Sequence, residues 1–179
     1  MRGALIPLLF SLRVLADVSG CACDPARPES LKARECSLCA EAEKQPAEVN
    51  IFFLKDANPR KPNRWLVLPR AHGKMQHSLA EMSPTERTAL WTAAIENARS
   101  LFGEQWGLAL NGDLTRTQCH AHLHIGKLLE EIETERVMVV DSPADIPAPA
   151  DGAGLWVHPH GGKLHVHLGE QLTETVLLR

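Results

Sequence analysis

Three histidines that could act on phosphorus lie in one short run, His120, His122 and His124. Residues 119–125 predict a strand, and side chains alternate faces along a strand, so the three imidazoles project to one side. A neutral imidazole is a competent nucleophile near neutral pH, because its ordinary pKa is about 6.5. The run therefore predicts phosphate chemistry through a phosphohistidine. A structural metal site and an incidental polar face are the alternatives.

A second group combines cysteines with histidines. Cys36 and Cys39 are two residues apart, and His72 and His120 follow them in the chain. Two thiolates at this spacing and two imidazoles would complete the tetrahedral shell of a structural zinc ion, Zn²⁺. In an oxidising compartment Cys36 and Cys39, or Cys23 with either of them, would instead form a disulfide. Both outcomes are open at this point.

A third group surrounds Gly161-Gly162 and consists of His158, His160, His165 and His167. A two-residue turn at the glycines would place His158 opposite His165 and His160 opposite Lys163. All four histidines would then share one face of a hairpin with Trp156. Such a face is a solvated polar surface, a lid on a substrate pocket or a transition-metal site, and no motif decides among them.

The elements that must position these groups form an antiparallel sheet with one long helix. Ser83-Pro-Thr-Glu86 is a capping box with proline at the first helical position, and the helix that follows ends at Gly103. Strands are predicted at residues 49–54, 65–68, 106–110, 119–125, 137–140 and 175–178. The fold class is therefore α+β, an antiparallel meander with one long central helix and a C-terminal β-hairpin extension.

The composition of the chain is that of a soluble globular protein. Its 179 residues are 44% hydrophobic and 23% charged, which suits one domain with a full core. The formal net charge of -3 argues against the basic face that nucleic-acid binding needs. We divide the chain into a Cys/Pro-rich segment at 21–48, a catalytic core at 49–127 and a C-terminal β extension at 128–179.

Residues 1–20 are interpreted as a signal peptide. Arg2 precedes an apolar stretch, residues 4–12, that is too short to span a bilayer. Val18-Ser-Gly-Cys21 matches the small-residue pattern before the lipidated cysteine of bacterial lipoproteins. We therefore expect export to the periplasm, with a lipid on Cys21 that tethers the domain to a membrane surface. A cytoplasmic protein with a short N-terminal arm is the alternative.

Taken together, the motifs resemble the histidine triad (HIT) superfamily. Trp65–His72 is similar to that family's strand and following histidine, and Ser83–Leu90 to the start of its central helix. Leu110–Gly112 and Gln118–His124 are similar to its active-site loop and strand. The run from Arg116 to Ile125 is most similar to the CDP-diacylglycerol pyrophosphatase branch. The resemblance covers about residues 36–127.

This resemblance implies hydrolysis or nucleotidyl transfer at a phosphoanhydride or phosphate ester of a nucleotide conjugate, including a CDP-diacylglycerol-like substrate. His122 would be the nucleophile, and His124 would contact the phosphate or the leaving group. Asn111 would orient the substrate, and Gln118 would donate a hydrogen bond to the transferred or departing group. An exported zinc- or copper-binding lipoprotein that uses the same fold without catalysis is the alternative function.

The resemblance also implies substrate contacts, a metal and a partner. Arg116 and Thr117 would surround the phosphates. Many members carry a histidine at the position of Arg64, which would supply a phosphate contact here. Several members hold zinc with a set that matches Cys36, Cys39, His72 and His120. Many members also form homodimers, so a homodimer is expected.

Overall fold

The computed structural model describes residues 18, 20–71, 78–130, 132–134 and 136–179. Within them the chain forms an antiparallel seven-stranded sheet, one long helix and one short helix, so the α+β prediction is confirmed. The strands are β1 Ile51–Lys55, β2 Trp65–Pro69, β3 Trp106–Leu110, β4 Leu123–Lys127, β5 Val137–Val140, β6 Gly154–His160 and β7 Lys163–Glu170. The helices are α1 Ser37–Glu43 and α2 Pro84–Phe102, and the short 3-10 turns include η6 Thr173–Val176.

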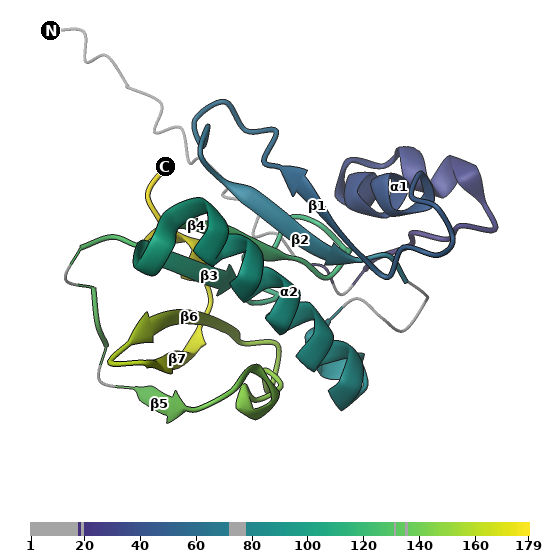
Figure 1. The fold of residues 1–179 in the computed structure, drawn as a ribbon. Helices are drawn as coiled ribbons and strands as arrows, with labels where there is room; N and C mark the ends of the chain where they lie inside the picture. Colours follow the sequence, from purple (N-terminus) through teal and green to yellow (C-terminus); the bar gives the residue numbers. More distant parts are fainter. Residues whose placement is uncertain (1–17, 19, 72–77, 131, 135) are drawn as a thin grey trace, which may run out of the picture.

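The long helix begins and ends where its local signals predict. The Ser83 hydroxyl accepts from the Glu86 N–H and the Glu86 carboxylate accepts from the Ser83 N–H, which satisfies two end groups of the helix. Gly103 closes the helix with a φ of 59° that favours glycine. Figure 1 shows α2 lying across one face of the sheet. Its buried side chains, including Leu90 and Trp91, pack there to form the main core.

The opposite face of the sheet is covered in two places. α1 packs on the β1–β2 hairpin through Leu38 and Ala42, which contact Phe52, Leu66 and Leu68. Farther along the sheet, Val176 and Leu177 of the C-terminal segment pack on Ala109 of β3 and Trp156 of β6. Between α1 and the C-terminal segment, part of this sheet face is not covered. His124 of β4 lies there.

The C-terminal hairpin continues the same sheet, because β6 pairs with β3 through Leu108 and Val157. Gly161 and Gly162 have φ values of 58° and 80°, as a two-residue hairpin turn requires. His158 lies opposite His165, and His160 lies opposite Lys163, so the predicted register is confirmed. The strand order β1-β2-β4-β3-β6-β7-β5 is not a simple meander, since β4 inserts between β2 and β3.

Three local predictions are wrong. β4 begins at Leu123, so His120 and His122 precede the strand, and a hydrogen bond from the His122 ring back to the His120 carbonyl holds them there. Residues 175–178 do not form the predicted strand, because the chain turns there as η6. The Arg64 guanidinium holds this turn by donating to the carbonyl oxygens of Glu174, Leu177 and Leu178. The Cys/Pro-rich segment, in which the sequence predicts no regular element, contains α1, whose apolar residues were too few to signal a helix.

The cysteines form two disulfides, Cys21–Cys119 and Cys23–Cys36. Cys39 is a buried free thiol. The first bond occupies the Cys21 sulfur that a lipid would need, so the predicted lipid anchor conflicts with the structure. Among the described residues, no helix is both long and apolar enough to cross a membrane.

Candidate functional site

The two downstream histidines of the run, His122 and His124, line one pocket of about 480 Å³ on the sheet face opposite α2. α1, the β1–β2 connection, the loop after β3 and the C-terminal segment supply the rest of its wall. The pocket is lined by Ser37, Leu38, Glu41, Leu54, Lys55, Asp56, Ala57, Asn58, Lys61, Leu66, Asn111, Thr115, Thr117, Gln118, His122, His124 and Glu174. It thus unites residues from nearly the whole length of the described chain.

The ring of His122 is held in one tautomer. Its Nδ1 lies 2.8 Å from the carbonyl oxygen of His120. A carbonyl oxygen only accepts hydrogen bonds, so Nδ1 carries the hydrogen and Nε2 keeps its lone pair. Burial lowers the pKa of His122 to about 4, helped by the nearby positive charge of Arg116 and opposed by the hydrogen bond to His120. The imidazole is therefore neutral at physiological pH, as a nucleophile must be.

Asn111 sets the tautomer of His124. The Asn111 Oδ1 accepts from the backbone N–H of Glu174 at 3.0 Å and from the Thr173 hydroxyl at 3.3 Å. The amide nitrogen of Asn111 therefore faces Nε2 of His124, at 3.4 Å, and donates to it. The hydrogen of His124 is then on Nδ1, and burial lowers the pKa of this ring well below 6.5.

Two pocket residues, Glu174 and Lys61, have no counterpart in the sequence prediction. The Glu174 carboxylate binds Lys61 in an ion pair, and one of its oxygens lies 3.7 Å from Nδ1 of His124. The same carboxylate lies 3.4 Å from Arg64. Burial raises the pKa of Glu174, but attraction to nearby positive charge outweighs burial and lowers it overall. His124 is neutral at physiological pH, so the positive charge that lowers the pKa of Glu174 there comes from Lys61 and Arg64.

Gln118 and Thr117 lie at the pocket, as predicted, but Gln118 is occupied. Its Oε1 accepts from the Ser37 hydroxyl at 2.8 Å and from the Leu38 N–H at 3.4 Å. Its Nε2 donates to the carbonyl oxygen of Arg34 at 3.0 Å. The side chain that was predicted to donate to substrate therefore ties α1 to the loop between β3 and β4. Thr117 is exposed at the pocket wall.

The two arginines predicted to bind phosphate are structural instead. Arg64 is 2% exposed, and its guanidinium donates to the C-terminal segment, including 2.7 Å to the Leu178 carbonyl. Arg116 is 3% exposed and donates to the Asp113 carboxylate at 2.9 Å. Neither residue is among those that line the histidine pocket, and both donate hydrogen bonds to the protein itself.

The predicted zinc set of Cys36, Cys39, His72 and His120 does not form from the described residues. Cys36 is bonded to Cys23, so its sulfur is not a thiolate, and this bond is the disulfide outcome that the sequence left open. Nε2 of His120 donates to the Pro69 carbonyl oxygen at 2.7 Å. His72 lies outside the described residues.

A different cluster could hold a metal ion. Glu133, His158, His165 and His167 each offer one ligand atom, and these atoms all lie within 4.8 Å of one another. Three cysteines, Cys23, Cys36 and Cys119, also gather within that distance, but all three are in disulfides.

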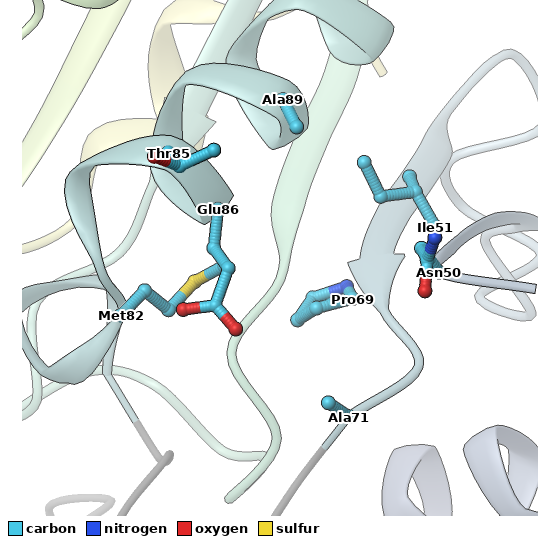
Figure 2. Close-up of a pocket in the computed structure, with 8 residues that line it drawn as sticks. All are labelled: Asn50, Ile51, Pro69, Ala71, Met82, Thr85, Glu86 and Ala89. Atoms are coloured by element: carbon cyan, nitrogen blue, oxygen red, sulfur yellow. The ribbon is translucent and has the colours of Figure 1, made fainter.

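A second pocket, of about 300 Å³, lies at the start of α2 on the face away from the histidines. Figure 2 shows Met82, Thr85, Glu86 and Ala89 on one side of it and Asn50, Ile51, Pro69 and Ala71 on the other. Glu86 is the ionisable residue of this lining, and its carboxylate is engaged with Ser83 in the helix cap. The lining is otherwise apolar or neutral.

Comparison with known proteins adds no family assignment. No protein-family model matches the sequence, and no curated protein matches it either.

Proposed function

We propose that the protein cleaves a nucleotide conjugate at phosphorus through a covalent intermediate on Nε2 of His122, as a HIT-type hydrolase or transferase. The observation that carries the proposal is the 2.8 Å hydrogen bond between the His122 ring and the His120 carbonyl. It leaves the Nε2 lone pair of a neutral imidazole in a polar pocket large enough for a nucleotide-sized ligand.

The reaction has two balanced steps. In the first, Nε2 of His122 attacks phosphorus, a P–N bond forms, and the bond from phosphorus to the leaving oxygen breaks. In the second, the oxygen of water or of an alcohol attacks phosphorus, and the electron pair of the P–N bond returns to Nε2. The phosphate product carries away the proton of the attacking oxygen. Water gives a hydrolase, and an alcohol gives a transferase.

The protonation state of His124 favours a phosphoanhydride substrate. A phosphate leaving group departs as a stable anion without a proton donor, whereas a simple alkoxide needs one. Burial keeps His124 neutral, so it is a weak acid at physiological pH. A nucleoside diphosphate ester, including CDP-diacylglycerol, meets this condition.

The charges of the pocket restrict how phosphate binds. Lys55 and Lys61 line it, but Lys61 is paired with Glu174, and Glu41 and Asp56 add further negative charge. The pocket therefore has little net positive charge with which to attract a phosphate. Neutral hydrogen-bond donors must supply much of the phosphate binding. Three hydroxyls lie at its wall. Ser37 already donates to Gln118 and Thr115 to the Gln171 carbonyl oxygen, so the exposed Thr117 hydroxyl is the one best placed to donate to a phosphate.

The test is a panel of nucleoside diphosphate esters, with CDP-diacylglycerol and nucleotide sugars among them, assayed for release of the nucleoside monophosphate. The parent protein should release it, and His122→Ala should lose at least about a thousandfold in kcat. Rapid quenching followed by mass spectrometry should find the nucleotidyl group, a nucleoside monophosphate joined through phosphorus, on the peptide that contains His122. A His160→Ala variant, altered at an exposed histidine of the hairpin, is the matched control. Equal turnover in His122→Ala and the parent would overturn the proposal.

Two further properties are proposed on separate grounds. We propose an oxidising compartment, such as the periplasm, because four of the five cysteines form disulfides. We also propose that the metal of this protein is zinc, and that it is bound by the histidine and glutamate cluster of the C-terminal hairpin rather than by Cys36 and Cys39.

A further inference from the structure

The histidines of the C-terminal hairpin lie on the same sheet face as the candidate active site. His124, Ala109, Trp156 and His167 are direct neighbours across four adjacent strands. Val157 and Val166 alternate with the histidines and pack into the α2 core, so His158, His165 and His167 project to the other face. Val176 and Leu177 cover the sheet between this cluster and the active-site pocket.

Four ligand atoms converge in this cluster. Nε2 of His158 lies 3.2 Å from Nε2 of His167. Oε1 of Glu133 lies 3.3 Å from Nδ1 of His165 and 3.1 Å from Nε2 of His167, and Oε2 lies 3.4 Å from Nε2 of His158. Zinc–ligand bonds of about 2.0–2.1 Å place neighbouring ligands of a tetrahedron about 3.3 Å apart. The separations in the cluster match that spacing.

Hydrogen bonds at Nδ1 of His158 and His167 leave Nε2 of each ring facing the centre of the cluster. Nδ1 of His158 lies 3.2 Å from the carbonyl oxygen of Pro159, so Nδ1 carries the hydrogen and Nε2 offers its lone pair to the cluster. Nδ1 of His167 lies 2.7 Å from the Thr134 hydroxyl, which is able to accept a hydrogen bond and leave Nε2 free to bind a metal. Such outer hydrogen bonds orient metal-binding histidines.

Packing holds the His167 ring in place. The ring stacks on the Trp156 indole at a centroid distance of 3.5 Å and an interplanar angle of 4°. The Trp156 Nε1 donates to Glu170 at 3.1 Å, which fixes the indole. His167 is fully buried, whereas the Glu133 side chain is 45% exposed. The cluster is thus rigid on the protein side and reachable from solvent on the Glu133 side.

An open cavity of about 460 Å³ adjoins the cluster and includes Glu133, His158 and His160 in its wall. It supplies a path by which a hydrated cation reaches the buried histidines. No such path would be needed by histidines that merely fill a core.

The geometry points to a zinc site with His158 Nε2, His165 Nδ1, His167 Nε2 and one Glu133 carboxylate oxygen as its four ligands. Imidazole nitrogen suits zinc, copper and nickel, whereas magnesium and calcium prefer an all-oxygen shell. Square-planar copper would place neighbours about 2.8 Å apart and opposite ligands about 4 Å apart. The three separations of 3.1, 3.2 and 3.3 Å are closer to the edges of a tetrahedron, and the other pairs of ligand atoms lie within 4.8 Å. Zinc has no geometric preference from its d electrons and is usually tetrahedral in structural sites.

An ion at this site would join two parts of the chain. Glu133 belongs to the connection between β4 and β5, and the histidines belong to β6 and β7. Glu133 pairs with all three of these histidines. Zinc would therefore fix the β4–β5 connection on the hairpin. This site is separate from His122, so it stands whether or not the proposed phosphate chemistry is correct.

The experiment is zinc titration of the chain, prepared without a histidine tag and stripped with a chelator, by calorimetry and by metal analysis after dialysis. One zinc ion per chain should bind, and it should raise the Tm. His167→Gln and Glu133→Gln should weaken binding more than tenfold and abolish the rise in Tm. Thr134→Val, which alters only the orientation of His167, should weaken binding by about 10- to 100-fold. Cobalt in place of zinc should give the strong visible absorption of a four-coordinate ion.

Two controls separate this site from its neighbours. His160→Gln changes a hairpin histidine outside the four ligands and should leave zinc affinity within about twofold of the parent. His122→Gln should also leave it unchanged. Absence of tight zinc binding in the parent overturns the proposal. So does binding that survives His167→Gln or that is lost in His122→Gln, because the ion would then be elsewhere.

Discussion

The carboxylate of Glu174 lies 3.7 Å from Nδ1 of His124, although the two residues come from the C-terminal segment and from β4. Asn111 connects the same two residues, because its Oδ1 accepts from the Glu174 N–H while its amide nitrogen donates to His124. The second histidine of the pocket is therefore oriented by the end of the described chain.

Glu174→Gln should lower kcat by about tenfold or more with a smaller change in KM. The amide keeps the shape of the side chain but removes the charge that faces Nδ1–H of His124 and that holds Lys61. Steady-state kinetics on the best ester of the panel measures the effect. Glu41→Gln is the matched control, since Glu41 also lines the pocket but pairs with Lys44. Equal losses in the two variants would show that the contact with His124 has no special role.

Arg64→Met should destabilise the fold by about 3–5 kcal/mol. The guanidinium is buried and donates to carbonyl oxygens of the C-terminal segment, which would be left without a donor. Urea unfolding measures the change. Arg60→Met, at an exposed position of the same β1–β2 connection, should change the free energy of unfolding by less than about 0.5 kcal/mol. Similar losses in both variants would contradict the structural role of Arg64.

Acid should destabilise the protein in two successive ranges. The pKa of His122 is lowered to about 4 in the folded state, so the unfolded chain binds a proton first as the pH falls from 6.5 toward 4, and stability is lost there. The pKa of Glu174 is also lowered, so its contribution is present above pH 4.5 and is lost below it. Urea unfolding between pH 7.5 and about 4 checks the first range. His122→Gln should flatten the slope there, and a slope unchanged by this variant would refute the assignment.

The Cys21–Cys119 disulfide should stabilise the fold more than the Cys23–Cys36 disulfide. The first closes a sequence separation of 98 residues and the second one of 13, and the loss of unfolded-chain entropy grows with loop length. We expect costs of about 4–5 and about 3 kcal/mol when each pair is replaced by serine. Denaturant unfolding of the two double variants gives the order. Mass spectrometry of the native protein checks the bond itself, since a lipid on Cys21 would exclude it.

Local signals in the sequence were enough for much of the fold. The capping box at Ser83 and Gly103 set the ends of α2 through contacts within a few residues, and Gly161-Gly162 set the hairpin register in the same way. Short apolar runs located β3 and β5 with their observed bounds. Elements that are fixed by contacts within a few residues can therefore be predicted from the sequence.

The site was predictable only in part, because its remaining contacts are long-range. His122, His124 and Asn111 belong to recognisable motifs and do share one pocket. Glu174 stands in a segment without any motif and enters the pocket through the buried Arg64, a contact that no spacing reveals. The pairing of five cysteines has several solutions of equal merit in sequence, and spatial distance selects among them. The cluster around Glu133 was missed for the same reason, because its histidine partners lie on β6 and β7, far along the chain.

The burial of Cys39 has a consequence for how the two disulfides persist. Cys39 is the one thiol left among the described cysteines, and it lies in the same cluster as Cys23, Cys36 and Cys119. Burial raises its pKa to about 11, so almost none of it is thiolate at neutral pH. Thiolate is the species that attacks a disulfide. Once the chain has folded, Cys39 is therefore a very poor attacker of the neighbouring disulfides. The pairing made during oxidation is protected from exchange with this thiol.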